Sequence, residues 1–257
     1  METVPLELDG ISVFVTKITG DELSNEEKEI GVFKQSPIIG AKLSAADYFS
    51  YISGHYSSYQ KIMTPSEVGC TLAHLEIYKR LLNSRFDGVV IFEKDIDISR
   101  ESIGKIKSLL AELKPGFIHL GWYPAVFEGR FFTGRVVDVI NGQQVYEVDP
   151  SNGFYGAFSY YVSRETARML LDFNSAFLHR ADEWRRFFNQ YNVKPLFSGV
   201  VSHPREGVSD IADRSRVAHP RIRDVQRRKL ERAILRVRGG VLGLLKGYRK
   251  ITSGYSG

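Results

Sequence analysis

The chain has 257 residues, of which 43% are hydrophobic and 25% are charged. This size and composition are typical of one large globular domain with a full core, or of one domain with an appendage. Cys70 is the only cysteine, which excludes an internal disulfide and favours a reducing compartment. The first ten residues lack the pattern of a secretory signal, and no stretch of 18 apolar residues predicts a membrane span.

The charge is unevenly distributed along the chain. Residues 221–257 hold 11 Lys or Arg and two acidic residues, a net charge of +9, which leaves −4 for residues 1–220 out of a total of +5. Between 221 and 250, apolar residues recur at helical spacing with arginines on the opposite face, as in helices that lie on a membrane surface. We expect this tail either to bind an anionic membrane or to pack as a solvated helix on the body.

Hydrophobic periodicity and end signals predict a succession of strands and helices. The clearest helix start is Thr64, followed by Pro65 and by Glu67, which completes a capping box. In chain order we expect a strand at 11–18, a helix at 64–82, a strand at 88–92, a helix at 99–114, a strand at 117–121, a hairpin at 136–148 turning at Asn141-Gly142, a strand at 156–162, a helix from 163 and a strand at 194–201.

The succession of strand, helix and strand between 88 and 121 indicates a crossover connection and parallel pairing of its two strands. Residues 21–28 predict a short helix or a loop, and residues 41–60 show only weak periodicity. The predicted fold class is α/β, with a mixed sheet flanked by helices and a basic helical tail at the carboxyl end.

The most informative segment is GVVIFEKDIDIS, residues 88–99. Its apolar run is typical of a strand buried on both faces, and Glu93, Asp95 and Asp97 follow where that strand leaves the sheet. Ligands of open α/β sheets bind just outside the carboxyl ends of the strands. Alternating carboxylates there are suited to Mg²⁺ or Mn²⁺ bridging phosphate oxygens, although a solvated acidic turn has the same sequence pattern.

A set of short motifs occurs in a fixed order along residues 11–211. The set comprises Gly69, Cys70, Leu72 and His74 at a helix start, the acidic pair Glu93 and Asp95, Leu120-Gly121 at a strand end, Ser163, Arg164, Ala167, Leu170 and Leu171 at the next helix, Asp182 with Trp184, Val193 with Pro195, and Ser209-Asp210-Ile211. In this order the motifs resemble glycosyltransferase family 25, the bacterial lipooligosaccharide galactosyltransferases related to the collagen galactosyltransferases.

The resemblance implies a GT-A-like, Rossmann-type catalytic domain over 1–220, followed by the tail at 221–257. It implies transfer of a hexose, galactose from UDP-galactose, to a lipooligosaccharide or related glycan, with inversion and with a divalent metal. A glycolipid acceptor and a basic tail together imply a cytoplasmic protein held peripherally at the inner face of the cell membrane. A nucleic-acid-binding role is disfavoured because residues 1–220 are acidic and carry no recognised nucleic-acid motif.

The resemblance also implies roles for individual residues. Glu93, Asp95 and Asp97 would hold the metal on one side of an extended segment, with Lys94 on the other side or close to the diphosphate. The family usually has an acid at the Lys94 position, and it opens with a strand and an Arg-rich segment that residues 1–10 do not supply. A catalytically impaired relative that binds a sugar or a partner is therefore the alternative function.

The remaining candidates belong to the acceptor and the nucleotide. Asp182, with Glu183 as second choice, would act as the general base on the acceptor hydroxyl, and the alternative is an acid that stabilises a helix start. His74 would contact the nucleotide or the acidic segment, or would be a core histidine. Trp122 would stack on a sugar or uracil, or lie in the core. Gly153 would allow the backbone to approach the sugar closely.

Overall fold

The computed structural model describes residues 6–8, 11–122, 133–149, 155–203, 245 and 247–251. Gly153 and the Ser209-Asp210-Ile211 motif lie outside these ranges, as does most of the tail predicted at 221–257. The part of that tail that the structure does describe includes a two-residue edge strand at Arg249–Lys250, so the predicted helix does not reach residue 250. No helix among the described residues has both the length and the apolarity needed to cross a bilayer.

Within the described residues, ten strands form one mixed sheet in the order β1-β2-β4-β8-β5-β9-β7-β6-β10, with β3 pairing with β2 off this path. The strands are β1 (Leu6–Leu8), β2 (Ile11–Ile18), β3 (Phe33–Gln35), β4 (Gly88–Glu93), β5 (Phe117–Trp122), β6 (Thr133–Ile140), β7 (Gln143–Val148), β8 (Ser159–Ser163), β9 (Leu196–Ser202) and β10 (Arg249–Lys250).

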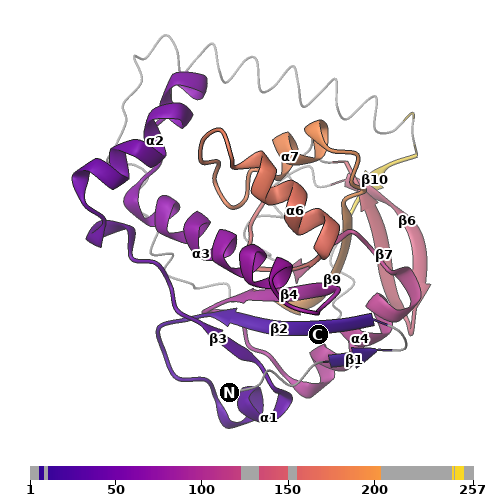
Figure 1. Ribbon diagram of the computed structural model, residues 1–257. Helices are drawn as coiled ribbons and strands as arrows, with labels where there is room; N and C mark the ends of the chain where they lie inside the picture. The colour runs from indigo at the N-terminus through magenta and orange to yellow at the C-terminus, as the bar shows by residue number, and fades with distance from the viewer. Residues whose placement is uncertain are drawn as a thin grey trace.

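Helices cover both faces of this sheet, with α2, α3, α6 and α7 on one side and α4 on the other (Figure 1). The helices are α1 (Asn25–Ile30), the 3-10 turn η1 (Gly40–Lys42), α2 (Ala45–Tyr59), α3 (Pro65–Leu82), α4 (Arg100–Leu113), α6 (Arg164–Phe173) and α7 (Trp184–Gln190). The predicted fold class, a mixed α/β sheet flanked by helices, is confirmed.

Local signals predicted the helix starts correctly. Thr64 caps α3 in a full capping box with Glu67, and Ser99 and Ser163 cap α4 and α6 with their side chains. A side-chain oxygen at such a position satisfies a backbone N–H that has no partner within the helix. The hairpin of β6 and β7 also forms, and its turn places Asn141 and Gly142 at positive φ, as a two-residue turn of this kind requires.

The expected direct pairing of β4 with β5 is wrong. The two strands run in the same direction, but β8 lies between them and pairs antiparallel with both. The crossover through α4 spans two strand positions, which leaves a slot at the centre of the sheet. The later segment Ser159–Val162, buried on both faces, fills that slot.

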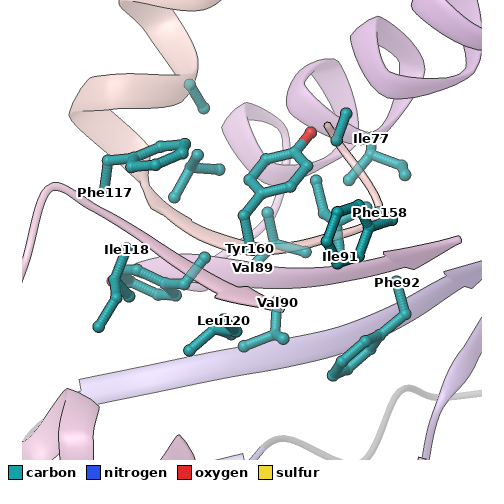
Figure 2. Packing of buried hydrophobic residues seen from close by; sticks show 14 of the residues in the cluster. Ile77, Val89, Val90, Ile91, Phe92, Phe117, Ile118, Leu120, Phe158 and Tyr160 are labelled. Atoms are coloured by element: carbon teal, nitrogen blue, oxygen red, sulfur yellow. The ribbon is translucent and has the colours of Figure 1, made fainter. Parts of the chain in front are cut away.

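Pleating divides the central strands between the two faces of the sheet. Figure 2 shows Tyr160 standing on the helix-covered side with its hydroxyl directed away from the strands, whereas Val90, Phe92 and Leu120 lie on the opposite side. Because Glu93 is separated from Val89 and Ile91 by even steps along β4, its side chain belongs on the same face as α3. The alternation of side chains along the strand therefore directs Glu93, the first acid of the motif, toward α3.

Candidate active site

The candidate site lies at one edge of the sheet. Strands β2, β4, β5 and β9 all run in the same direction, so their carboxyl ends meet at that edge. The edge receives Glu93 from β4, Trp122 from β5 and His203 directly after β9. The backbone N–H of His203 donates to the carbonyl of Trp122 (2.7 Å), which ties the last two strand ends together. Ligands of α/β sheets bind at this kind of edge.

Glu93 faces two side chains of α3. Its Oε1 lies 3.7 Å from the Sγ of Cys70, which donates to it, and 3.6 Å from the Nε2 of His74. Cys70 and His74 are one helical turn apart, so both side chains project from the same side of α3. Burial, followed by the negative charges of Glu93 and Asp182, raises the pKa of the Cys70 thiol well above its usual value.

His74 is both a core residue and a neighbour of the acidic segment. Its ring is 1% exposed and stacks on Tyr160, and its Nδ1 lies 2.6 Å from the hydroxyl of Tyr160. That hydroxyl is in turn 2.6 Å from the hydroxyl of Tyr78. The two interpretations of His74 made from the sequence are therefore not exclusive, because the packed ring presents its Nε2 to Glu93.

Asp95 is bound by His203 across the edge. The Nε2 of His203 lies 2.9 Å from the Oδ2 of Asp95, and the other carboxylate oxygen, Oδ1, is buried with no hydrogen-bond partner among the described residues. Burial on its own would raise the pKa of Asp95, but the hydrogen bond and charge of His203 and the charge of Lys94 hold it below its usual value. The carboxylate is therefore ionised at neutral pH.

The segment after β4 forms a turn, whereas the sequence predicted an extended chain there. The strand ends at Glu93, residues 94 and 95 form a turn, and the N–H of Ile96 donates back to the carbonyl of Glu93. The turn breaks the two-residue alternation, so Glu93, Asp95 and Asp97 do not share one side of a strand. Asp97 and Lys94 are exposed, whereas Glu93 and Asp95 are partly buried. Metal binding by these acids stays a prediction.

Asp182 and Glu183 precede α7 and have different surroundings. Glu183 accepts hydrogen bonds from Arg180 (2.9 Å) and Arg186 (3.0 Å) with a side chain that is 15% exposed. Burial would raise the pKa of Glu183, but the two guanidinium groups hold it below its usual value. The charge of Asp182 acts on Arg180 as well, and it also helps to raise the pKa of Cys70 on α3.

The aromatic and glycine candidates are less informative. The Trp122 side chain is 4% exposed, and its ring contacts Phe197 in a T-shaped arrangement, as expected for the core alternative. Stacking of Trp122 on a ligand stays a prediction. Gly153 lies outside the described residues. His119, read from the sequence as structural, is fully buried, and burial lowers its pKa to about 4.

Three residues at this edge were not proposed as site residues from the sequence: Cys70, Tyr160 and His203. Cys70 could have been proposed from its i, i+4 spacing with His74 on a helix, because a strand that ends in an acid follows that helix. His203 lies two residues after the last predicted strand, close to the position where ligand-binding side chains are expected. Tyr160 carries no local signal, because its role depends on β8 entering the centre of the sheet.

Comparison with known families supports the assignment that the motif order suggested. A family model described as glycosyltransferase family 25 (LPS biosynthesis protein) matches residues 13–184. The chain belongs to glycosyltransferase family 25. No curated protein matches it. The family match begins within β2 and ends at Trp184, so it contains every candidate site residue named from the sequence but not His203.

Glycosyltransferase family 25 therefore supplies the general activity, transfer of a sugar in lipopolysaccharide biosynthesis. The family match begins at residue 13, within β2, so residues 1–10 lie outside it. The expectation that residues 1–10 do not supply the opening strand and the Arg-rich segment of the family stays a prediction. Family membership does not by itself specify the donor, the acceptor or the metal.

Replacing Glu183 by Gln tests whether this acid stabilises the loop before α7. We expect Glu183→Gln to lower the free energy of unfolding at neutral pH by about 1–3 kcal/mol, because two charge-assisted hydrogen bonds are weakened, a part-buried one from Arg180 and an exposed one from Arg186. The pKa of Glu183 in the folded protein lies below its ordinary value of 4.5. The ionised form therefore stabilises the fold above that value, and this stabilisation is lost as the pH falls through the folded pKa.

Urea denaturation of wild type and Glu183→Gln over a pH series from 7 downward measures this effect. The difference in unfolding free energy should be largest near neutral pH and shrink in acid. Glu165→Gln, on the exposed side of α6, is the matched control and should change stability by less than about 0.5 kcal/mol. A difference for Glu183→Gln that does not depend on pH would contradict the assignment.

Proposed function

We propose that the protein transfers galactose from UDP-galactose to a lipooligosaccharide or related glycan acceptor, with inversion at the anomeric carbon and with a divalent cation. The proposal is carried by one observation: in a chain of family 25, two ionisable acids of the strand-end motif, Glu93 and Asp95, lie partly buried where the parallel strands end. This is the edge at which a nucleotide is expected to bind.

Asp95 suits a hard cation such as Mn²⁺ or Mg²⁺. The Oδ1 atom is buried and without a hydrogen-bond partner among the described residues, so the carboxylate has an oxygen available for a cation. Glu93, whose side chain is 29% exposed, would be the second ligand, and the exposed Asp97 would be a third. When bound, the cation would neutralise the charge that develops on the diphosphate.

The protein's own residues would carry the rest of the reaction. The acceptor hydroxyl oxygen attacks the anomeric carbon, the bond from that carbon to the diphosphate oxygen breaks, and UDP leaves with the bonding electrons. The hydroxyl proton goes to Asp182, which we favour as the base because its charge reaches Cys70, the neighbour of Glu93. Lys94 is exposed beside Asp95, where its ammonium group could approach the diphosphate.

The alternative function is that of an impaired relative that binds a sugar or a partner without turnover. The observation that favours it is Lys94, a cation within the acidic motif, whose charge acts directly on Asp95. In this alternative, the ammonium group of Lys94 takes the place of the metal and supplies the positive charge that the metal would bring. Turnover measurements distinguish the two functions.

A donor screen with and without Mn²⁺ tests the proposed reaction. We expect UDP-galactose to be hydrolysed or transferred faster than other UDP-hexoses and only in the presence of the cation. Asp95→Asn should lower kcat/KM at least about 100-fold, the effect of removing a group that stabilises developing charge. Glu165→Gln, exposed at the start of α6 and at the opposite edge of the sheet, is the control. Turnover of no UDP-hexose by the folded protein would establish the impaired alternative.

The general base is tested separately. Asp182→Asn should lower kcat by about 100- to 10,000-fold while leaving the midpoint of thermal unfolding and the KM for the donor nearly unchanged. Asp182→Asn could instead keep nearly full activity while Glu183→Gln loses much more activity than its lower stability explains. That result would assign the role of base to Glu183.

Residues 221–250 would hold the enzyme at the cytoplasmic face of the membrane, where a glycolipid acceptor is found. Support comes from the net charge of this segment and from its helical pattern of apolar residues. Each cation near an anionic leaflet contributes on the order of 1 kcal/mol. The glycolipid acceptor and the membrane contact are thus parts of one proposal.

Partitioning of the full chain onto vesicles tests the membrane contact. A variant with Arg227, Arg228, Arg232 and Arg236 replaced by Gln should bind vesicles rich in phosphatidylglycerol at least about 100-fold more weakly than wild type. Neutral phosphatidylcholine vesicles are the control surface, and donor hydrolysis should be equal in both proteins. Binding to duplex DNA at physiological salt, without binding to anionic vesicles, would contradict the proposal.

A further inference from the structure

Three side chains of different chemistry converge between α3 and the end of β4. Cys70 Sγ, His74 Nε2 and a carboxylate oxygen of Glu93 all lie within 4.8 Å of one another. They combine a thiol, an imidazole and a carboxylate, which together are the ligand types that zinc accepts. The described residues contain no other group of three or more such side chains this close together.

We infer that Cys70, His74 and Glu93 form a binding site for Zn²⁺, adjacent to the hard cation proposed at Asp95 and sharing Glu93 with it. The thiol decides the class of metal, because sulfur ligands select zinc and other soft cations, whereas Mg²⁺ and Mn²⁺ prefer oxygen. Three protein ligands leave the fourth tetrahedral position open for water or another small ligand.

The distances from Glu93 to the other two side chains agree with a tetrahedral site. Bond lengths of about 2.3 Å to sulfur and about 2.0–2.2 Å to nitrogen and oxygen place a sulfur and an oxygen about 3.6 Å apart, and a nitrogen and an oxygen about 3.4 Å apart. The observed separations are 3.7 Å for Cys70 and Glu93 and 3.6 Å for His74 and Glu93. For these two pairs zinc would require shifts of only a few tenths of an ångström, and the sulfur of Cys70 and the Nε2 of His74 lie within 4.8 Å of each other.

His74 supplies the independent observation that points to a ligand. Its ring is 1% exposed, and its Nε2 is buried without a hydrogen-bond partner among the described residues. The separation of 3.6 Å from Glu93 is too long for a hydrogen bond, whichever ring nitrogen carries the proton. A buried polar atom left in this state costs free energy, and a cation bound to it removes that cost.

The surroundings of His74 match those of a metal ligand. A histidine that binds zinc commonly donates its other ring N–H to an oxygen, which sets the ring orientation. The Nδ1 of His74 meets the hydroxyl of Tyr160 at 2.6 Å, and the hydroxyl of Tyr78 holds Tyr160 at the same distance. Burial raises the pKa of Tyr160, so its hydroxyl stays neutral. The tyrosine pair would leave Nε2 free to bind metal.

The charges around the three side chains and the exposure of the site also favour binding of a cation. Burial and the charges of Glu93 and Asp182 disfavour the thiolate of Cys70 when no metal is present. The same negative potential attracts a divalent ion, whose charge then stabilises the thiolate. Cys70 and the side chain of Glu93 are only partly buried, so the site is accessible from one side. Bound zinc would fix the end of β4 against α3 and would leave the second oxygen of Glu93 available.

Cobalt substitution of the full-length protein, stripped of metal with a chelator, tests this site. We expect one Co²⁺ per chain, a sulfur-to-cobalt charge-transfer band in the near ultraviolet, and displacement of both by one equivalent of Zn²⁺. Cys70 is the only cysteine of the chain, so such a band in the wild-type protein identifies its ligand without any variant. A folded wild-type protein that binds cobalt without this band would overturn the inference.

Variants separate this inference from the proposed function. Cys70→Ser should lose the charge-transfer band and His74→Gln should bind cobalt at least about 10-fold more weakly, since one of three ligands is lost in each. Circular dichroism establishes whether each variant is folded. Asp95→Asn is the matched control, because it should keep the band while losing manganese-dependent turnover. A band that persists unchanged in Cys70→Ser would also overturn the site.

Discussion

The shared direction of β2, β4, β5 and β9 is the constraint on which the site depends. Parallel strands deliver their carboxyl ends to one edge, and that edge therefore collects Glu93, Trp122 and His203 from three distant segments of the chain. The arrangement requires β8 to run in the opposite direction between β4 and β5, which brings Tyr160 under α3. A change of register in β8 would move Tyr160 to the other face of the sheet.

The polar groups at this edge are held by a small number of buried contacts. Tyr78, Tyr160 and His74 form a chain of hydrogen bonds between α3 and β8, and His203 binds Asp95 across the ends of β9 and β4. Such networks are strong in a low-dielectric interior only when their members are satisfied. Among the described residues, the buried Oγ of Ser159, opposite Phe92, has no hydrogen-bond partner, and neither do Nε2 of His74 and Oδ1 of Asp95, which belong to the proposed metal sites. We interpret the last two of these unsatisfied atoms as a sign of binding rather than of poor packing.

Much of the fold follows from local sequence, and the site follows from it only in part. The capping box of Thr64, the Asn141-Gly142 turn and the buried run of β4 act over a few residues, so their predictions are confirmed. The insertion of β8 could not be predicted, because the order of strands depends on contacts between distant segments. The contact of Asp95 with His203 depends on that order and was missed for the same reason. The turn at residues 94 and 95 was also missed, since alternating acids suggest an extended chain.

The central claim is that the carboxyl edge of β4 binds the diphosphate of a sugar nucleotide through a cation. The most direct test is a crystal structure of the full chain with UDP and Mn²⁺, in which anomalous scattering locates the metal. The account predicts a manganese peak at the carboxylate of Asp95, with the diphosphate beside it and the uracil near the ends of β2 and β4. Nucleotide density at the opposite edge of the sheet, or a manganese ion that contacts neither Asp95 nor Glu93, would contradict it.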